Sequence, residues 1–185
     1  GHMHKAGKEI KEAMPDVDLL IEIVDARLPF SSANPLLSDL RGNKPCIKIL
    51  NKADLADPVR TQAWQDYLEQ EEGVRTLATI ALNSDAVPKV IDLCRKLVPN
   101  KTESTKVMHV LIMGIPNVGK STLINALAGR TIAKTGNEPA VTKRQQRIDL
   151  NNGIILCDTP GMLWPNLENI NTGYRLATTG AIKDT

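Results

Sequence analysis

The sequence predicts an α/β fold in which a mostly parallel sheet carries helices on both faces. Short runs rich in Ile, Leu and Val alternate with helical stretches along the 185-residue chain, a pattern typical of strands joined by crossover helices. Strands of this kind are buried on both faces, which explains why the runs are almost continuously apolar. The tight-turn sequence Asn151-Asn152-Gly153 joins two runs directly, so we expect one antiparallel hairpin in the sheet.

The amino-terminal half supplies three strands and three helices. Residues 1–18 are polar and charged and predict a short amphipathic helix or arm before Pro15. The expected strands are residues 19–24, 46–50 and 74–82. The expected helices are residues 34–40, 59–70 and 87–97. Pro88 fits the first turn of the last helix, because the N–H that proline lacks has no helical partner there.

The carboxy-terminal half follows a polar linker. Residues 99–106 contain no apolar residue apart from Pro99 and predict a surface segment. The elements expected after it are a strand at 107–113, a helix at 120–128, a polar loop at 130–143 and hairpin strands at 145–150 and 154–157.

Composition narrows the class of protein. Hydrophobic residues make up 42% and charged residues 24% of the chain, enough for a globular core. The apolar runs fall far short of the roughly 18 residues that a membrane-spanning helix needs. Cys46, Cys94 and Cys157 lie far apart, which argues against a disulfide framework or a zinc site. With no signal-peptide pattern at the start, we expect a cytoplasmic protein that makes no contact with membranes.

The overall charge does not indicate a dedicated nucleic-acid binder. The net charge is +2 and aromatic residues make up only 3% of the chain. Residues 134–147 are more basic than the rest, with four cationic side chains and one anionic one. These are Lys134, Lys143, Arg144, Arg147 and Glu138. The segment could face RNA or be a solvated loop, and the residues alone leave both interpretations open.

Residues 114–121 read Gly-Ile-Pro-Asn-Val-Gly-Lys-Ser and match the phosphate-binding GxxxxGKS loop. The backbone amides of such a loop and the helix that follows concentrate positive potential on phosphates. Lys120 would reach the β- and γ-phosphates and assist their transfer, and Ser121 would ligate Mg²⁺. The nucleotide contacts expected here are Asn117, Val118, Gly119, Lys120, Ser121 and Thr122. The loop predicts a P-loop NTPase, a three-layer sandwich of helices around the sheet.

The choice of base rests on Asn51-Lys52-Ala53-Asp54, which follows the strand expected at 46–50. The carboxylate of Asp54 can accept hydrogen bonds from N1 and the exocyclic amino group of guanine. Asn51 can satisfy the O6/N7 side, and the stem of Lys52 can lie along the base. Adenine would leave the Asp54 carboxylate unpaired. The motif therefore favours GTP over ATP.

The DxxG pattern occurs twice. Residues 39–42 end a helix, where Gly42 is an ordinary cap. Residues 158–161 follow a strand and lie downstream of the phosphate-binding loop. We assign Asp158 to the Mg²⁺ shell through water and the amide of Gly161 to the γ-phosphate.

The order of these motifs is unusual. GTPases ordinarily run from the P-loop through a switch threonine and DxxG to NKxD and a Ser-Ala base loop, whereas here NKxD precedes the P-loop. The sequence therefore resembles a circularly permuted GTPase, in which the same sheet is built with changed connectivity. The linker at 99–106 would join the two ends of the unpermuted fold.

Among permuted GTPases, the chain most resembles the ribosome-biogenesis GTPases of the RbgA/YlqF family. The resemblance spans essentially the whole chain and includes Asp25-Ala26-Arg27, the P-loop, residues 158–165 (DTPGMLWP) and residues 180–184 (GAIKD). It implies a Mg²⁺-dependent GTPase, slow without its ribosomal partner, that acts as a monomer in late assembly of the large ribosomal subunit. It also implies one permuted GTPase domain over residues 1–185, without the family's helical C-terminal domain.

The resemblance assigns further residues. It favours Thr142 over Thr131 and Thr135 as the second, catalytically important hydroxyl on Mg²⁺. It places the base loop at Ala81 and Leu82, where Ser-Ala is usual and backbone amides do the binding. Asn117 resembles the asparagine that ligates K⁺ in potassium-activated GTPases, although it could instead bond its own backbone.

The position after Gly161 holds Met162, where many GTPases have a glutamine that orients the attacking water. Methionine cannot hold water in this way. The resemblance implies that the amino-terminal His2 substitutes for glutamine as a catalytic residue. Gly1-His2-Met3 is also the sequence that a cleaved affinity tag leaves behind, so the origin of His2 stays open.

Two alternatives and one unassigned motif remain. The chain could be a GTP-dependent RNA or ribosome docking module with negligible hydrolysis, which Met162 would permit. An ATP-using enzyme is disfavoured by the motif that ends at Asp54. Asp25 and Arg27 belong to the resemblance but receive no chemistry from it, and we expect them to form an ion pair beside the sheet.

Overall fold

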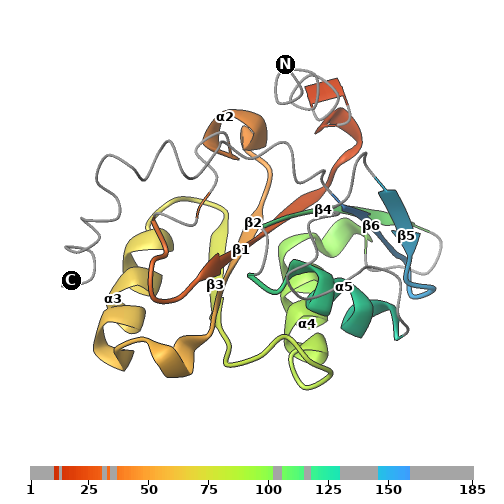
Figure 1. The fold of residues 1–185 in the computed structure, drawn as a ribbon. Coiled ribbons are helices and arrows are strands. Elements are labelled where there is room, and N and C mark those ends of the chain that lie inside the picture. The colour runs from red at the N-terminus through yellow and green to blue at the C-terminus, as the bar shows by residue number, and fades with distance from the viewer. Residues whose placement is uncertain are drawn as a thin grey trace, which may run out of the picture.

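The fold is built around one sheet. The computed structural model describes residues 11–12, 14–30, 33, 37–101, 106–114, 118–129 and 146–158. Their strands lie in the order β3-β2-β1-β4-β6-β5 (Figure 1). They are β1 (Leu19–Asp25), β2 (Cys46–Asn51), β3 (Val74–Ala78), β4 (Met108–Gly114), β5 (Gln146–Asp149) and β6 (Ile154–Asp158). All neighbouring strands are parallel except β5 and β6, which confirms the predicted fold class.

The helices lie between the strands along the chain. They are α2 (Leu37–Arg41), α3 (Pro58–Leu68), α4 (Val87–Leu97) and α5 (Lys120–Ala128), and the 3₁₀ turns are η1 (Met14–Asp16), η2 (Ala53–Leu55) and η3 (Pro99–Lys101). Helices α4 and α5 have the predicted bounds, because local signals fix their ends. Pro88 lies in the first turn of α4, and Gly129 caps α5 in a left-handed conformation at φ 72°.

Strand β3 is shorter than predicted, ending at Ala78 instead of continuing to residue 82. Its neighbour β2 ends at Asn51, so after the amide of Thr79, which donates to the carbonyl of Leu50 at 2.9 Å, the chain has no further strand residues to pair with. It follows the loop after β2 instead, and the carbonyl of Thr79 accepts a hydrogen bond from the amide of Ala53 at 2.8 Å. A contact between distant loops ends this strand.

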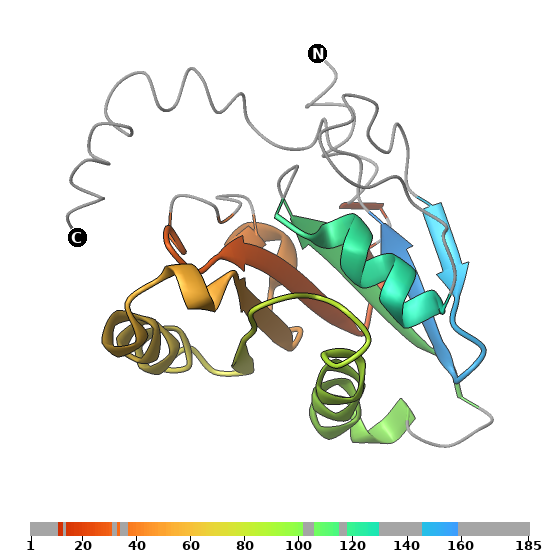
Figure 2. The ribbon, with the colours of Figure 1, turned by 60° about the horizontal axis from the view of Figure 1, so that its bottom comes forward.

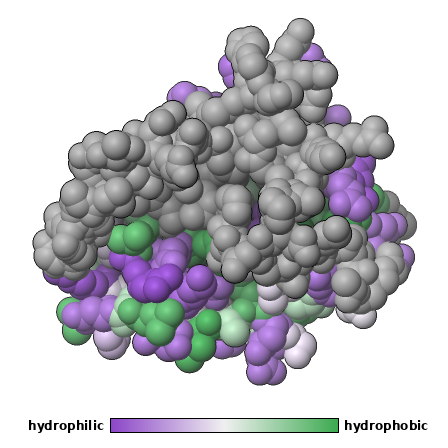
Figure 3. Space-filling model, in the orientation of Figure 1, coloured by the Kyte–Doolittle hydropathy of each residue, from purple (hydrophilic) through white to green (hydrophobic). Residues whose placement is uncertain are grey.

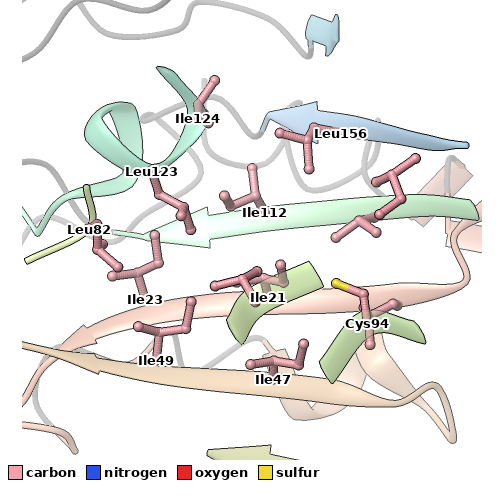
Figure 4. Packing of buried hydrophobic residues seen from close by; sticks show 14 of the residues in the cluster. Ile21, Ile23, Ile47, Ile49, Leu82, Cys94, Ile112, Leu123, Ile124 and Leu156 are labelled. Atoms are coloured by element: carbon pink, nitrogen blue, oxygen red, sulfur yellow. The ribbon is translucent and has the colours of Figure 1, made fainter. Parts of the chain in front are cut away.

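The larger apolar core lies between the sheet and the pair α4 and α5, which cover one face (Figure 2). Alternate residues of β1, including Ile21 and Ile23, point to this side because successive strand residues face opposite ways. They pack with Leu123 and Ile124 of α5 and with Cys94 of α4 (Figure 4). This core fixes the start of α5 relative to the strand before it.

The opposite face carries α2 and α3. Leu20, Leu111 and Met113 of the sheet pack with Leu37 and Leu40 of α2. Trp64 and Leu68 of α3 pack in turn against a small cluster that contains Val24 and Leu50. Outside these contacts, the described surface over α3 mixes hydrophilic and apolar residues (Figure 3). The described residues contain no helix that is long and apolar enough to cross a membrane.

Strand β4 adjoins the point at which the order of the strands across the sheet reverses. Strands β1, β2 and β3 extend to one side of it, and β6 and β5 extend to the other. In open sheets of this kind, ligands bind at such a point, outside the carboxyl ends of the strands. Because β1, β2, β4 and β6 are parallel, the loops that follow them all emerge at this edge.

Candidate nucleotide-binding site

The phosphate-binding loop leaves β4 at Gly114 and enters α5 at Lys120. Gly119 immediately precedes the helix with φ 109°, a conformation that side chains rarely adopt. A Cβ atom there would lie 2.8 Å from both Asn51 Nδ2 and Leu82 Cδ1. Glycine is therefore required at this position both by the backbone conformation and by the close approach of two other loops.

Lys120 and Asp158 form an ion pair at this edge. Their Nζ and Oδ1 atoms are 2.6 Å apart, and the two side chains are only 12% and 2% exposed. Lys120 opens α5, whereas Asp158 ends β6, so the fold brings the P-loop lysine to the DxxG aspartate. Ser121 is half-buried in the same first helical turn, and Thr122 beside it is exposed.

Asn51 joins three loops. Its buried side chain donates from Nδ2 to the carbonyl of Val118 at 2.9 Å and accepts at Oδ1 from Thr79 Oγ1 at 3.1 Å. Its backbone carbonyl accepts from the amide of Ala26 at 2.7 Å. The expected role for Asn51 was a contact with O6 and N7 of guanine. Its carboxamide thus links three loops and keeps one N–H and one oxygen lone pair for a ligand, so the expected contact with guanine stays a prediction.

The next residues present polar groups outward. Lys52 adopts a left-handed conformation with φ 65°, a strain of order 1 kcal/mol for a residue other than glycine. The following turn η2 is tied down by a bond from the amide of Leu55 to the carbonyl of Lys52 at 2.9 Å. Asp54 lies exposed within this turn. A strained, anchored loop that exposes a carboxylate is well suited to ligand recognition.

The predicted base loop lies next to the P-loop. Leu82 is 1% exposed and packs in the core beside Gly119, whereas Ala81 is exposed. The side chain of Leu82 thus belongs to the core, and a backbone contact from Ala81 or Leu82 to a base stays a prediction. His2, Asn117, Thr142 and Gly161 lie outside the described residues, as do Thr131, Thr135 and Met162.

The expected ion pair between Asp25 and Arg27 is present at the end of β1. Arg27 Nε donates to Asp25 Oδ1 at 3.0 Å and Nη2 donates to Oδ2 at 2.7 Å. Burial alone would raise the pKa of Asp25, but hydrogen bonds from Arg27 and the charges of Arg27 and Lys52 bring the pKa below its usual value. This pair was predicted from its residues, whereas the bond from Thr79 to Asn51 has no signal in the sequence.

Together these features define a class of protein. A mostly parallel sheet presents a GxxxxGKS loop, the aspartate of a DxxG motif and an NKxD loop at one edge, so the chain is a P-loop GTPase with permuted connectivity. Residues 109–182 match the family model described as 50S ribosome-binding GTPase. The chain is 46% identical to ribosome biogenesis GTPase A of Priestia megaterium over its full length, covering 67% of that protein. It is 37% identical to the mouse mitochondrial ribosome-associated GTPase 1, covering 60% of it.

The solved structures agree. GNP-bound YlqF from T. maritima superposes with a TM-score of 0.59 at 32% identity, covering 88% of this chain and 60% of YlqF. GDP-bound YlqF gives 0.61 at 30% identity, covering 94% and 66%. The chain belongs to the ribosome biogenesis GTPase A family, which makes it a GTP-binding and GTP-hydrolysing switch protein of ribosome assembly. It spans about two thirds of the length of the relatives it matches.

Proposed function

We propose that this chain is the GTPase switch of a factor that acts on the large ribosomal subunit, or its precursor and rRNA, late in assembly. The observation that carries the proposal is the convergence of three motifs at one sheet edge, with Asn51 bonded to the P-loop residue Val118 and Lys120 paired with Asp158. The family model for 50S ribosome-binding GTPases supports the choice of particle. We place the protein in the cytoplasm, as a monomer that makes no contact with membranes.

The residues at the site suit a bound Mg²⁺. Ser121 offers a hydroxyl and Asp158 a buried carboxylate, and hard oxygen donors are what Mg²⁺ prefers. The described residues hold no cluster of three His, Cys, Asp or Glu side chains, which suits an ion held largely by waters and phosphates. Bound there, Mg²⁺ would neutralise charge on the β- and γ-phosphates. Ser121 would ligate it directly, Asp158 through water, and Thr142 would add a second hydroxyl.

The remaining contacts with the nucleotide would come from side chains and backbone amides of the protein. Lys120 would exchange its bond with Asp158 for contacts to the β- and γ-phosphates, and the amide of Gly161 would bind the γ-phosphate. Asp54 would accept hydrogen bonds from N1 and the 2-amino group of guanine. Lys52 would lie along the base, and Ala81 and Leu82 would offer backbone amides to it. Positioning and charge stabilisation of this kind account for most of the catalysis in phosphoryl transfer.

Two finer assignments have simple tests. His2 would orient the attacking water in place of the glutamine that Met162 replaces, so His2→Ala should lower turnover stimulated by ribosomal particles. Unchanged turnover would remove His2 from the mechanism. Asn117 would ligate K⁺ beside the phosphates, so hydrolysis should be faster in potassium than in sodium chloride. Equal rates would remove the potassium site.

The central experiment measures GTP hydrolysis by the purified chain with and without large-subunit particles, together with co-sedimentation in a GTP analogue and in GDP. We expect slow turnover alone, stimulation by the particles, and co-sedimentation that depends on the analogue. Binding without stimulated turnover would favour a GTP-dependent docking module, which Met162 permits. Lys120→Ala is the control that should abolish turnover.

A further inference from the structure

The proposed function leaves one motif beside the site without a role. Strand β1 ends at Asp25, whose partner across the sheet is Asn51, the first residue of the guanine-recognition motif. The next amide along the chain, that of Ala26, donates to the carbonyl of Asn51 at 2.7 Å. Asp25 and Ala26 therefore lie directly beside Asn51, and a backbone hydrogen bond joins the two segments.

The Asp25–Arg27 pair is held by three hydrogen bonds. The Arg27 guanidinium binds the carboxylate with two donors, and its backbone amide adds a third bond to Oδ1 at 2.9 Å. The side chain of Asp25 is only 14% exposed, whereas that of Arg27 is 45% exposed. Bidentate geometry and a partly buried carboxylate hold both groups in fixed positions, which flexible surface pairs do not achieve.

Asp25 and Arg27 interact with charges of opposite sign in the recognition loop, residues 51–54. The hydrogen bond that Arg27 donates to the Asp25 side chain raises the pKa of Arg27, and the negative charge of Asp54 raises it further. The positive charge of Lys52 helps to lower the pKa of the Asp25 carboxyl. Each charge of the pair thus attracts an opposite charge of the loop.

The loop needs such support. Lys52 is held in a left-handed conformation, and Asp54 lies exposed in a single 3₁₀ turn. The backbone bonds at Ala53 and Leu55 fix the main chain of the loop, but they do not direct the charged ends of its side chains.

We propose that Asp25 and Arg27 are positioning residues for guanine recognition, with Asp25 orienting Lys52 and Arg27 orienting Asp54. Neither contacts the nucleotide. The pair holds the carboxylate of Asp54 toward both N1 and the 2-amino group of the base. This inference rests on the proposed assignment of Asp54 to guanine.

Inosine diphosphate provides the test, because its base keeps N1–H but lacks the 2-amino group that forms the second bond to Asp54. We expect Arg27→Ala to weaken GDP binding about tenfold and IDP binding by much less, so that the preference for GDP shrinks. Asp25→Asn should have the same effect. Combining the two substitutions should cost no more than the larger single effect, because each removes the same pair.

Lys96→Ala is the matched control, since it breaks the exposed Lys96–Asp92 pair of α4 and should alter neither affinity nor melting temperature. If Arg27→Ala keeps the GDP preference, or weakens both nucleotides equally while lowering the melting temperature, the pair is merely structural and the inference is overturned. If the unmodified chain itself does not prefer GDP to IDP, the assignment of Asp54 to guanine fails, and the inference falls with it.

Discussion

The two strands beside β4 each carry a buried carboxylate paired with a lysine. Glu22 of β1 pairs with Lys48 at 2.9 Å, and Asp158 of β6 pairs with Lys120 at 2.6 Å. The chemistry is the same, but the settings differ. Glu22 lies in the middle of its strand on the face that carries α2, whereas Asp158 ends its strand on the face covered by α5.

The two ion pairs differ in whether a ligand could replace one of the partners. Glu22 and Lys48 are opposite each other on adjacent strands, so the sheet register holds them together. Lys120 belongs to the first turn of a helix after a glycine-rich loop, where we expect phosphates and a metal ion to take over the lysine and the carboxylate. We therefore expect the interior pair to be structural and the edge pair to be exchanged for ligand. The predictions below test this distinction.

The largest effect should come from breaking the interior pair. Glu22→Ala removes the partner of Lys48, whose side chain is only 16% exposed, and a buried pair broken in this way costs about 3–5 kcal/mol. Glu22→Leu combined with Lys48→Met should recover most of that loss, because an apolar pair needs no compensation. Urea unfolding measures both. A loss below about 1 kcal/mol for Glu22→Ala would contradict a structural role.

Removing the lysine of the edge pair also leaves a buried carboxylate unpaired, but unlike a change in the interior pair it should act on ligand binding as well. We expect Lys120→Ala to weaken GTP binding by about 100-fold, near 3 kcal/mol, because the phosphates lose a charge-assisted contact. In the unmodified chain, nucleotide at 100 times its Kd should add about 2.7 kcal/mol of stability, and Lys120→Ala should lose this gain. The Leu–Met variant of the interior pair should keep it. If the two variants responded alike to nucleotide, the distinction would fail.

A smaller effect is expected where the loops meet. Gly119→Ala would push a Cβ atom to 2.8 Å from Asn51 and Leu82 at a φ of 109°, which should cost roughly 1–3 kcal/mol and weaken nucleotide binding. Gly129→Ala is the matched control. It also has a positive φ, but a Cβ atom there meets nothing within 4 Å. Calorimetry should show a modest loss of stability and unchanged nucleotide affinity for the control. Equal loss of affinity in both variants would contradict the crowding at Gly119.

These regions also show which features can be predicted from the sequence. Pro88 and Gly129 are local signals that made the bounds of α4 and α5 predictable. The fold class and the motifs at Lys120 and Asp54 were also predictable, because they depend on patterns within the sequence. The ion pair of Asp25 and Arg27 was predictable too, since its members are two residues apart.

The remaining features depend on packing between distant segments. Asn51 bonds to Val118, 67 residues away, and the end of β3 is set by the end of β2. The sequence shows a glutamate within the apolar strand β1 and a lysine within β2. Their pairing could not be predicted, because the sequence of neither strand alone determines the register between parallel strands. The same limit explains why the bonds of Asn51 to Val118 and Thr79 could not be predicted, whereas its expected contact with guanine stays a prediction.

The smallest effect concerns a pair that lies between the two extremes, Asp25 with Arg27, which is held rigidly but reaches solvent. Burial raises the pKa of Asp25, yet the hydrogen bonds and charge of Arg27 lower it overall below its usual 3.8. A carboxyl group with a lowered folded pKa stabilises the fold above the unfolded value and loses that contribution as the pH falls through the folded value. The unmodified chain should therefore exceed Asp25→Asn in stability by under about 1 kcal/mol near neutral pH. Urea unfolding should show this difference shrinking below pH 3.8, whereas growth on acidification would show that the carboxylate is not held by Arg27.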